Sequence, residues 1–457
     1  MKEQLFEETT LLLSVVKWTL LSTLVGGLVG LSTTVFLKSL TWSIRWVSDL
    51  PYALLLLPVG GFLTGLLLYT LAPEAEGHGT EAVIKAVHER RGAIAARVAP
   101  VKLLVTVFTI ASGGSAGKEG PAAQIGASVA STLARFLRLT PQDRKILVIC
   151  GISAGFASVF GTPIAGALFG IEVLFLGQML YEVLLPSFVA GIIAFQTSRY
   201  FGITYFYHPI TFVPRFSEGF FLKMIAAGIL FGLTAILLVE SLKYAGQRFK
   251  RIPVWPPLRP AIGASLLMLL ALFVSRDSLG LGLRTIEASV SGGDVPFLAF
   301  LWKVIATSLT LGSGGSGGII TPIFYIGSTA GSFFAGFLRV DPGTLAAIGM
   351  VAVLAGAANT PIAASIMAIE LFGPGIGVYA AVASVVSYLI SGHRSVYMSQ
   401  ILASRKSQSL RVSLQKDLEH LEGVELSEAA RRRLLRLQRV LRRIVWREQA
   451  RQEDRES

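Results

Sequence analysis

One ten-residue pattern occurs twice in this chain, as SGGSAGKEGP at 112–121 and as SGGSGGIITP at 313–322. The same spacing also brings further identical residues into register: Ile125-Gly126 with Ile326-Gly327, Phe136-Leu137-Arg138 with Phe337-Leu338-Arg339, Pro141 with Pro342, and Ala154-Gly155 with Ala355-Gly356. After a gap of three residues the match resumes, with 162–165 against 360–363 and Ile171-Glu172 against Ile369-Glu370. Chance does not hold one register over this length, so the chain consists of two related halves.

Long apolar runs recur along both halves. Each is near the roughly 20 residues that a helix needs to cross a bilayer; examples are 18–37, 53–71, 220–239, 260–274 and 362–390. Only 15% of the 457 residues are charged and 53% are hydrophobic, whereas a soluble domain carries about 25% charged residues. These features predict an all-α polytopic membrane protein with many short, tilted and partly crossing helices.

The duplication also predicts where a ligand would bind. Duplicated membrane proteins with glycine- and proline-interrupted helices place their binding site at mid-membrane, where the halves meet. A helix that begins there presents unpaired N–H groups and a partial positive charge, which attract an anion without holding it too tightly for release. We predict a transport domain over 1–402, with halves at about 11–205 and 215–402, and a short tail at 403–457.

The chain has a net charge of +13, and within this tail 431–447 holds eight basic residues and no acid. Leu434, Leu437, Leu441 and Ile444 form one stripe at helical spacing. Two readings fit equally: a basic amphipathic helix on the cytoplasmic membrane face, or a solvated or self-associating tail. Either reading puts the termini in the cytoplasm, and neither suggests nucleic acid as a partner.

Three motifs of soluble enzymes are imitated but lack their structural setting. Residues 312–317 fit G-x-G-x-x-G without the β-α-β unit, and Gly117-Lys118 is followed by Glu119 where a P-loop needs Ser or Thr. Residues 151–155 fit the nucleophile elbow around Ser153, but the matching 352–356 has no serine. We therefore expect no enzyme activity, and keep a membrane hydrolase built on Ser153 as a different-class alternative.

Glu119 is the strongest candidate functional residue. It follows a glycine run and begins a helix within an apolar region. A carboxylate costs at least roughly 2.5 kcal/mol at mid-membrane, more than the 0.3–1 kcal/mol that a surface helix cap contributes. Such a carboxylate would compete with an anion for the helix end, and protonation would release it. These properties favour a gate and proton acceptor over a simple cap.

The same residues closely resemble the CLC family of chloride channels and chloride/proton exchangers, over about 20–402. Residues 117–121, GKEGP, match the family signature whose glutamate is the external gate. Gly318, Ile319 and Ile320 resemble the family's anion-coordinating G-x-F-x-P motif, with Ile320 in place of Phe, and Tyr397 matches its anion-contacting tyrosine. The resemblance implies an inverted repeat, a homodimer with one pore in each subunit, and chloride as the bound ion.

Two departures from the family pattern bear on function. The first anion motif, typically G-S-G-I-P, reads here Gly77, His78, Gly79, Thr80 and Glu81, so that a histidine replaces the serine that usually contacts the anion. Two interpretations are open: His78 hydrogen-bonds the ion, or it is a loop histidine without ion contact. Fluoride-exporting relatives also depart from the family pattern at this motif. The backbone N–H groups of Gly79 and Thr80 could still bind the anion. In many exchangers an acid relays protons at the position that Val173 occupies here.

Because valine cannot carry a proton, the sequence favours a passive chloride channel. A chloride/proton antiporter working without the relay acid is the alternative, and a fluoride-selective relative is a further one. Lys102 and Lys118 are expected to raise the local potential for anions, although Lys102 could equally snorkel to the interface. A cation transporter is disfavoured by the few acids in the apolar segments. We expect the cell membrane as location, and no cofactor or metal.

Overall fold

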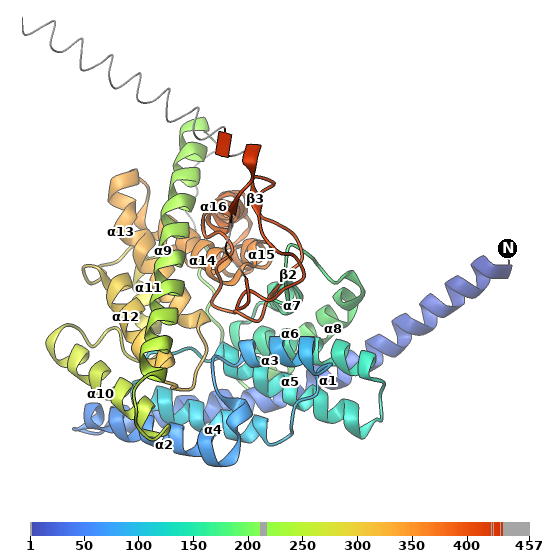
Figure 1. The fold of residues 1–457 in the computed structure, drawn as a ribbon, viewed down its shortest axis with the longest axis horizontal. Helices are drawn as coiled ribbons and strands as arrows, with labels where there is room; N and C mark the ends of the chain where they lie inside the picture. Colours follow the sequence, from blue (N-terminus) through green and yellow to red (C-terminus); the bar gives the residue numbers. More distant parts are fainter. Residues whose placement is uncertain (1, 211–216, 422, 424, 430, 433–457) are drawn as a thin grey trace, which may run out of the picture.

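The structure is a computed structural model that describes residues 2–210, 217–421, 423, 425–429 and 431–432. It is built almost wholly of helices, as the apolar runs predict (Figure 1). The predicted amphipathic helix at 431–447 lies almost entirely outside the described residues.

The two halves have the same order of helices. The first half contains α1 (Lys2–Ser48), α2 (Leu56–Leu71), α3 (Thr80–Glu89), α4 (Val98–Ala111), α5 (Glu119–Phe136), α6 (Pro141–Phe160), α7 (Pro163–Glu172) and α8 (Leu184–Tyr200). The second contains α9 (Glu218–Lys250), α10 (Leu258–Phe273), α11 (Leu283–Val290), α12 (Ala299–Gly312), α13 (Ile320–Leu338), α14 (Pro342–Ala358), α15 (Pro361–Phe372) and α16 (Gly377–Ile390). The repeated sequence therefore encodes a repeated structure.

Short elements join these helices. The 3-10 turns are η1 (Ala53–Leu55), η2 (Pro73–Ala75), η3 (Tyr181–Val183) and η4 (Pro374–Ile376). Strand β1 (Phe175–Leu176) pairs in parallel with β2 (Ile401–Leu402), and β3 (Leu410–Arg411) pairs antiparallel with β4 (Glu425–Leu426). The β1–β2 pair fastens the segment after α16 to the end of the first half.

Equivalent signals in the sequence set equivalent helix ends. Thr140 caps α6 by accepting the Asp143 N–H, and Asp341 caps α14 by accepting the Thr344 N–H, each just before a proline at the first helical position. At the other end, Gly161 and Asn359 close α6 and α14 in the left-handed conformation. Glycine and asparagine are the residues that adopt this conformation most readily.

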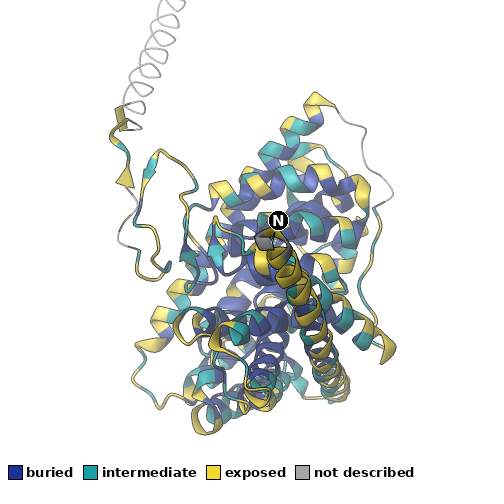
Figure 2. Ribbon diagram, turned by 90° about the vertical axis from the view of Figure 1, so that its right-hand side faces the viewer, coloured by how far each residue is buried: buried dark blue, intermediate teal, exposed yellow. Residues whose placement is uncertain are grey.

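Among the described residues, four helical stretches are long and apolar enough to cross a membrane: Phe6–Ser48, Ala53–Leu71, Tyr181–Tyr200 and Glu218–Lys250. The others are shorter apolar helices, which agrees with the predicted short segments. The run at 362–390 is not one helix, because Gly373 (φ +91°) breaks it between α15 and α16. Helices α5, α6, α13 and α14 form the buried interior, while much of α1 is exposed (Figure 2).

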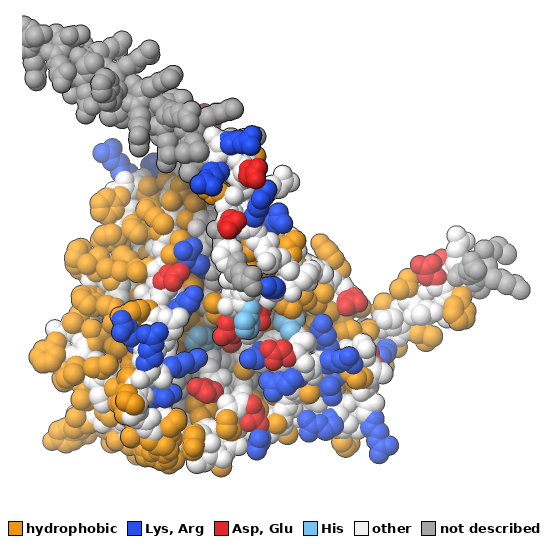
Figure 3. Space-filling model, in the orientation of Figure 1, with side chains coloured by type: hydrophobic (Ala, Val, Ile, Leu, Met, Phe, Trp, Pro, Cys, Tyr) orange, Lys and Arg blue, Asp and Glu red, His pale blue; other side chains and the backbone are white. Residues whose placement is uncertain are grey.

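Side-chain chemistry separates two kinds of surface. In Figure 3, hydrophobic side chains cover the helices along the left and lower edges, and charged side chains gather in the middle, over α3 and the segment after α16. Large exposed hydrophobic residues occur on α1, α2, α9 and α10. An apolar belt with a charged face is the arrangement expected of a protein whose flanks contact lipid.

Candidate functional site

The two halves meet backbone to backbone at a pair of equivalent glycines. The Gly117 N–H donates to the Gly318 carbonyl at 2.7 Å, and the Gly318 N–H donates to the Gly117 carbonyl at 2.6 Å. These residues occupy the same position in the two copies of the ten-residue pattern. Reciprocal contacts between equivalent positions are the mark of a twofold relation, so the pseudo-twofold axis of the repeat passes between them.

Hydroxyl groups around the glycines repeat this reciprocity. The Ser115 N–H donates to Thr310 Oγ1 at 3.0 Å, and the equivalent Ser316 N–H donates to Thr109 Oγ1 at 3.1 Å. The two serine hydroxyls pair in turn with Thr307 (3.0 Å) and Thr106 (3.1 Å), which are again equivalent. All these residues are buried. Their contacts bring the start of α5 and the start of α13 together in the interior.

The symmetry breaks at Glu119. Its carboxylate is fully buried and reaches across to the second half. There the Thr321 N–H donates to Oε2 at 3.2 Å and the Thr321 hydroxyl donates to Oε1. Thr321 is in the first turn of α13, so the carboxylate occupies the electropositive end of that helix. The residue equivalent to Glu119 in the second half is Ile320, which has no charge to offer in return.

Thr321 was not among the residues predicted from the sequence. The signal that could have found it is its position next to Pro322 at a helix start. Its neighbours Gly318, Ile319 and Ile320 are buried where α13 begins, as expected. Lys118 lies directly beside Glu119 and is half-buried.

The segment of Gly77, His78, Gly79 and Thr80 packs against the start of α5. Gly79 has φ +82°, and a Cβ on it would lie 2.2 Å from the Gly120 carbonyl oxygen. A Cβ on Gly120 would in turn lie 2.0 Å from the His78 carbonyl oxygen. Only glycines allow this approach. The motif residues from 77–80 and 117–121 therefore meet in space.

Lys102 holds this segment in place. Its ammonium is fully buried and donates to the carbonyls of Ala75 (3.0 Å) and Gly77 (2.7 Å), which rules out snorkelling to the interface. At the start of the segment, Arg97 pairs with Glu74 at 2.8 Å. Although partial burial works against it, a backbone hydrogen bond and the Arg97 guanidinium hold the pKa of Glu74 below its usual range. The segment is thus tied to α4 at two points.

Three buried polar atoms around this segment have no well-aligned hydrogen-bond partner among the described residues: His78 Nδ1, Thr80 Oγ1 and Tyr397 Oη. The Tyr397 and Thr80 hydroxyls are neighbours, and the Tyr397 hydroxyl lies within electrostatic range of Glu119. Buried polar groups are almost always paired. Hydroxyl groups converging in an apolar interior fit a small anion, to which each can donate a hydrogen bond.

A polar network positions the segment that bears Tyr397. The Tyr397 N–H donates to Ser395 Oγ at 3.0 Å, and the buried Gln400 amide accepts from Ser395 Oγ at 2.6 Å. The other end of the Gln400 amide donates to the Val173 carbonyl at 2.9 Å. The Val173 side chain is itself buried and apolar. The predicted relay position therefore takes part in holding the tyrosine segment through its backbone.

Glu172 and Glu370 act as reciprocal helix caps. Glu172 ends α7 and accepts the N–H groups of Ile362 (3.1 Å) and Ala363 (2.8 Å) at the start of α15. Glu370, near the end of α15, accepts those of Ile164 (3.1 Å) and Ala165 (2.8 Å) at the start of α7. Each carboxylate thus satisfies unpaired donors of the other half.

The structure offers no enzyme-like site at Ser153. This serine is in the middle of α6, where its hydroxyl donates to the Ala167 carbonyl at 3.3 Å, and not on a strand-to-helix turn. Over the described part of the chain, no group of three His, Cys, Asp or Glu side chains is arranged to hold a metal ion.

Two helix starts from two inverted halves, a carboxylate on one of them and unpaired hydroxyls beside it define a class: a membrane protein with an internal anion site. Comparison with known families supplies the rest. Residues 60–392 match the family described as voltage gated chloride channel. The chain therefore belongs to the CLC family, whose members carry anions across membranes.

Individual relatives agree with this assignment. A chloride/fluoride channel protein of Pseudomonas syringae pv. tomato is 39% identical over 407 residues, which cover 88% of this chain and 90% of the relative. The crystal structure of a CLC-type fluoride/proton antiporter has a TM-score of 0.81 at 32% identity, and the match covers 84% of this chain and 98% of that one. A slow cyanobacterial Cl⁻/H⁺ antiporter shares the fold, with a TM-score of 0.72 at 21% identity over 82% and 94% of the two chains.

Proposed function

We propose that this protein exchanges fluoride for protons across the cell membrane, with Glu119 as the group that alternately blocks the anion path and carries the proton. The observation that carries the proposal is the position of the Glu119 carboxylate on the N–H and hydroxyl of Thr321. A helix end that binds a carboxylate can bind another anion in its place. Protonation of Glu119 would remove its charge and release the site.

The preference for fluoride rests on the donors at the site. Thr80 and Tyr397 each bring a buried hydroxyl to it, and no side chain in the predicted site other than Glu119 is acidic. Fluoride is small and charge-dense, so short hydrogen bonds from hydroxyl groups compensate well for its lost hydration. Two relatives that match most of this chain, one compared by sequence and one by structure, both carry fluoride in their names. These arguments move our proposal from chloride, which the sequence favoured, to fluoride.

A passive chloride channel is the second candidate. It is favoured by one specific observation, the buried Val173 at the position where many exchangers have a relay acid. Exchange requires a different route for protons from the cytoplasm to Glu119.

Flux measurements on the purified protein in liposomes separate these candidates. Vesicles would be loaded with fluoride or chloride, and anion efflux and external pH recorded together. Fluoride efflux that drives protons uphill supports the proposal. Chloride efflux without proton movement supports the channel, and absence of any anion flux from folded protein contradicts both.

The remaining predictions from the sequence are part of this proposal. We propose a homodimer in which each subunit has its own path, a C-terminal segment on the cytoplasmic side, and bound anions rather than a cofactor in the site. Chemical crosslinking in native membranes, followed by accessibility labelling of introduced cysteines, tests the assembly and the orientation.

A further inference from the structure

Protons reach a buried carboxylate through water or through titratable side chains, and the Val173 side chain is not titratable. Among the buried carboxylates of the described residues, Glu81 stands out because one of its oxygens, Oε2, is buried without a hydrogen-bond partner. Glu172, by comparison, has both oxygens bonded to backbone N–H groups. A buried carboxylate oxygen without a donor is stabilised when it binds a proton.

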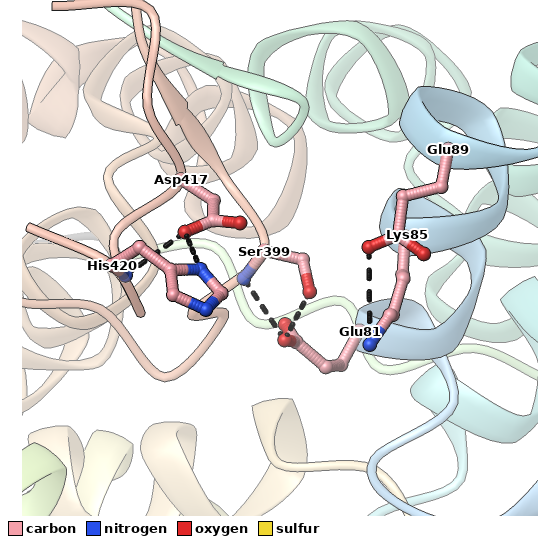
Figure 4. A network of polar contacts seen from close by, with 6 residues as sticks. All are labelled: Glu81, Lys85, Glu89, Ser399, Asp417 and His420. Carbon is pink, nitrogen blue, oxygen red and sulfur yellow. Dashed lines mark hydrogen bonds and ion pairs between the residues drawn. The ribbon is translucent and has the colours of Figure 1, made fainter.

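The other oxygen of Glu81 ties two distant segments together. Oε1 accepts the Ser399 N–H at 2.9 Å and the Ser399 hydroxyl at 2.7 Å, so α3 is joined to the segment that carries Tyr397 (Figure 4). Glu81 also directly follows Thr80, whose hydroxyl neighbours that of Tyr397. The Tyr397 hydroxyl is within electrostatic range of both Glu81 and Glu119. Glu81 therefore lies beside the anion site, on its α3 side.

Behind Glu81 lies a cavity of about 840 Å³ on the charged face of the molecule. Ser399 is part of its wall, so the residue that holds Glu81 is also in contact with the cavity. Of the other ten lining residues, Ile401, Gln415 and Leu421 are not titratable, and seven are: Lys85, His88 and Glu89 from α3, and Lys416, Asp417, Glu419 and His420 from the C-terminal segment. Of these, Glu419 and Lys85 interact electrostatically with Glu81. Such a lining admits water and protons up to the wall beside Glu81.

We propose that Glu81 is a second proton-carrying residue, which passes protons between this cavity and the anion site and so replaces the relay acid that is missing at Val173. In each cycle Oε2 binds one proton from cavity water and releases one proton toward the Tyr397 and Glu119 side. Only O–H bonds form and break, and the carboxylate returns to its starting state. This inference rests on the proposed fluoride/proton exchange and adds the inner half of its proton route.

The test is the proton-to-anion ratio of Glu81→Gln in liposomes. Glutamine keeps an oxygen to accept both bonds from Ser399 but cannot carry a proton at this site. We expect fluoride efflux within about twofold of the unmodified protein, and a fall of at least about tenfold in protons moved per fluoride, equivalent to roughly 1.4 kcal/mol or more. Glu81→Asp, which retains a carboxyl group, should recover part of the ratio.

Two controls separate proton transfer from a structural tether. Glu287→Gln, which changes an exposed acid on α11, the counterpart of α3 in the second half, should leave the ratio unchanged. Ser399→Ala removes one of the bonds to Glu81 and should also leave it unchanged, because the carboxyl group remains. A Ser399→Ala protein that loses coupling as Glu81→Gln does would overturn the proposal, and so would a Glu81→Gln protein that loses fluoride flux altogether.

The remaining outcomes distinguish this inference from the proposed function. If the unmodified protein exchanges fluoride for protons and Glu81→Gln keeps its full ratio, the inference fails and the exchange stands. If the unmodified protein moves anions without protons, both fail together.

Discussion

The starts of α5 and α13 occupy equivalent places in the two halves, yet they differ in the residue that matters most. Glu119 in the first half corresponds to Ile320 in the second, so at this pair of positions only the first half sends a carboxylate across the pseudo-twofold axis. The surrounding contacts remain reciprocal, from Gly117 and Gly318 outward. The reciprocal packing contacts require equivalent residues in the two halves. A path with a single proton-binding carboxylate requires the two halves to have different residues at one pair of positions.

The two loops held by buried lysines are also anchored in the same way but carry different residues. Lys102 donates to the Ala75 and Gly77 carbonyls, and its equivalent Lys303 donates to the Ser278 (3.0 Å) and Gly280 (2.8 Å) carbonyls. The first loop continues into His78 and Thr80, with unpaired polar atoms, and the second into Leu281 and Leu283. One anchored loop is equipped to contact an ion and the other is apolar.

The largest functional difference between equivalent positions of the two halves is expected at Glu119. In Glu119→Gln the proton-carrying group is lost while the shape of the side chain is kept. We expect proton movement to fall to background while fluoride efflux continues, measured with paired fluoride and pH electrodes. Ile320→Val at the equivalent position is the matched control and should retain coupling. Proton movement that survives in Glu119→Gln would contradict the assigned role.

The next largest difference is expected between the two buried lysines, Lys102 and Lys303. Replacing either by Met leaves two buried carbonyls without their donor, at about 1–3 kcal/mol each, and should lower the unfolding temperature in both variants. Only Lys102→Met should also reduce anion flux, because only the first loop lies at the anion site. If the cost of one or two unpaired carbonyls raises the barrier to anion passage, the flux falls by roughly ten- to a hundredfold. Equal flux losses in Lys102→Met and Lys303→Met would show that the two loops do not differ in function.

Thr321 tests a hydrogen-bonded contact between the two halves that has no counterpart at the equivalent positions. Thr321→Val removes the hydroxyl bond to the carboxylate, and bonds to charged groups contribute about 1.5–3 kcal/mol. Because the carboxylate then competes less well, we expect the apparent affinity for fluoride to rise by roughly tenfold. Isothermal titration with fluoride measures this, with Thr329→Val, deeper in the same helix, as control. An unchanged or weaker affinity would mean that the Thr321 hydroxyl contributes to binding fluoride rather than to holding the Glu119 carboxylate.

The reciprocal caps should give the smallest difference. Glu172→Ala and Glu370→Ala each remove two acceptors from a helix start, at about 0.5–2 kcal/mol of unfolding free energy. Glu172 is buried and Glu370 is partly exposed, so the loss should be larger for Glu172→Ala because water can replace the missing acceptor at Glu370. Thermal unfolding of the purified variants measures the difference. The reverse order would show that burial does not set the cost at these caps.

Much of the fold could be predicted because its signals are local or repeated. Helix-length apolar runs, proline at the first turn and the duplicated pattern are all readable along the chain, and they predicted helices, halves and the position of Glu119 at a helix start. The run at 362–390 was misjudged as near one span because Gly373 can be accommodated in a helix or break it, and only its packed neighbours decide which.

The sequence by itself determined that this chain is a duplicated helical membrane protein of the CLC family, because hydrophobic length and repeated motifs do not depend on contacts. Only the tertiary structure decided which partner each buried polar group has. In the folded chain Thr321 donates hydrogen bonds to Glu119, Ser399 donates to Glu81, and Lys102 donates to backbone carbonyls. Each of these bonds joins residues that are far apart in the sequence. In an apolar interior every such group must find a partner in space, and spacing along the sequence does not say which one it finds.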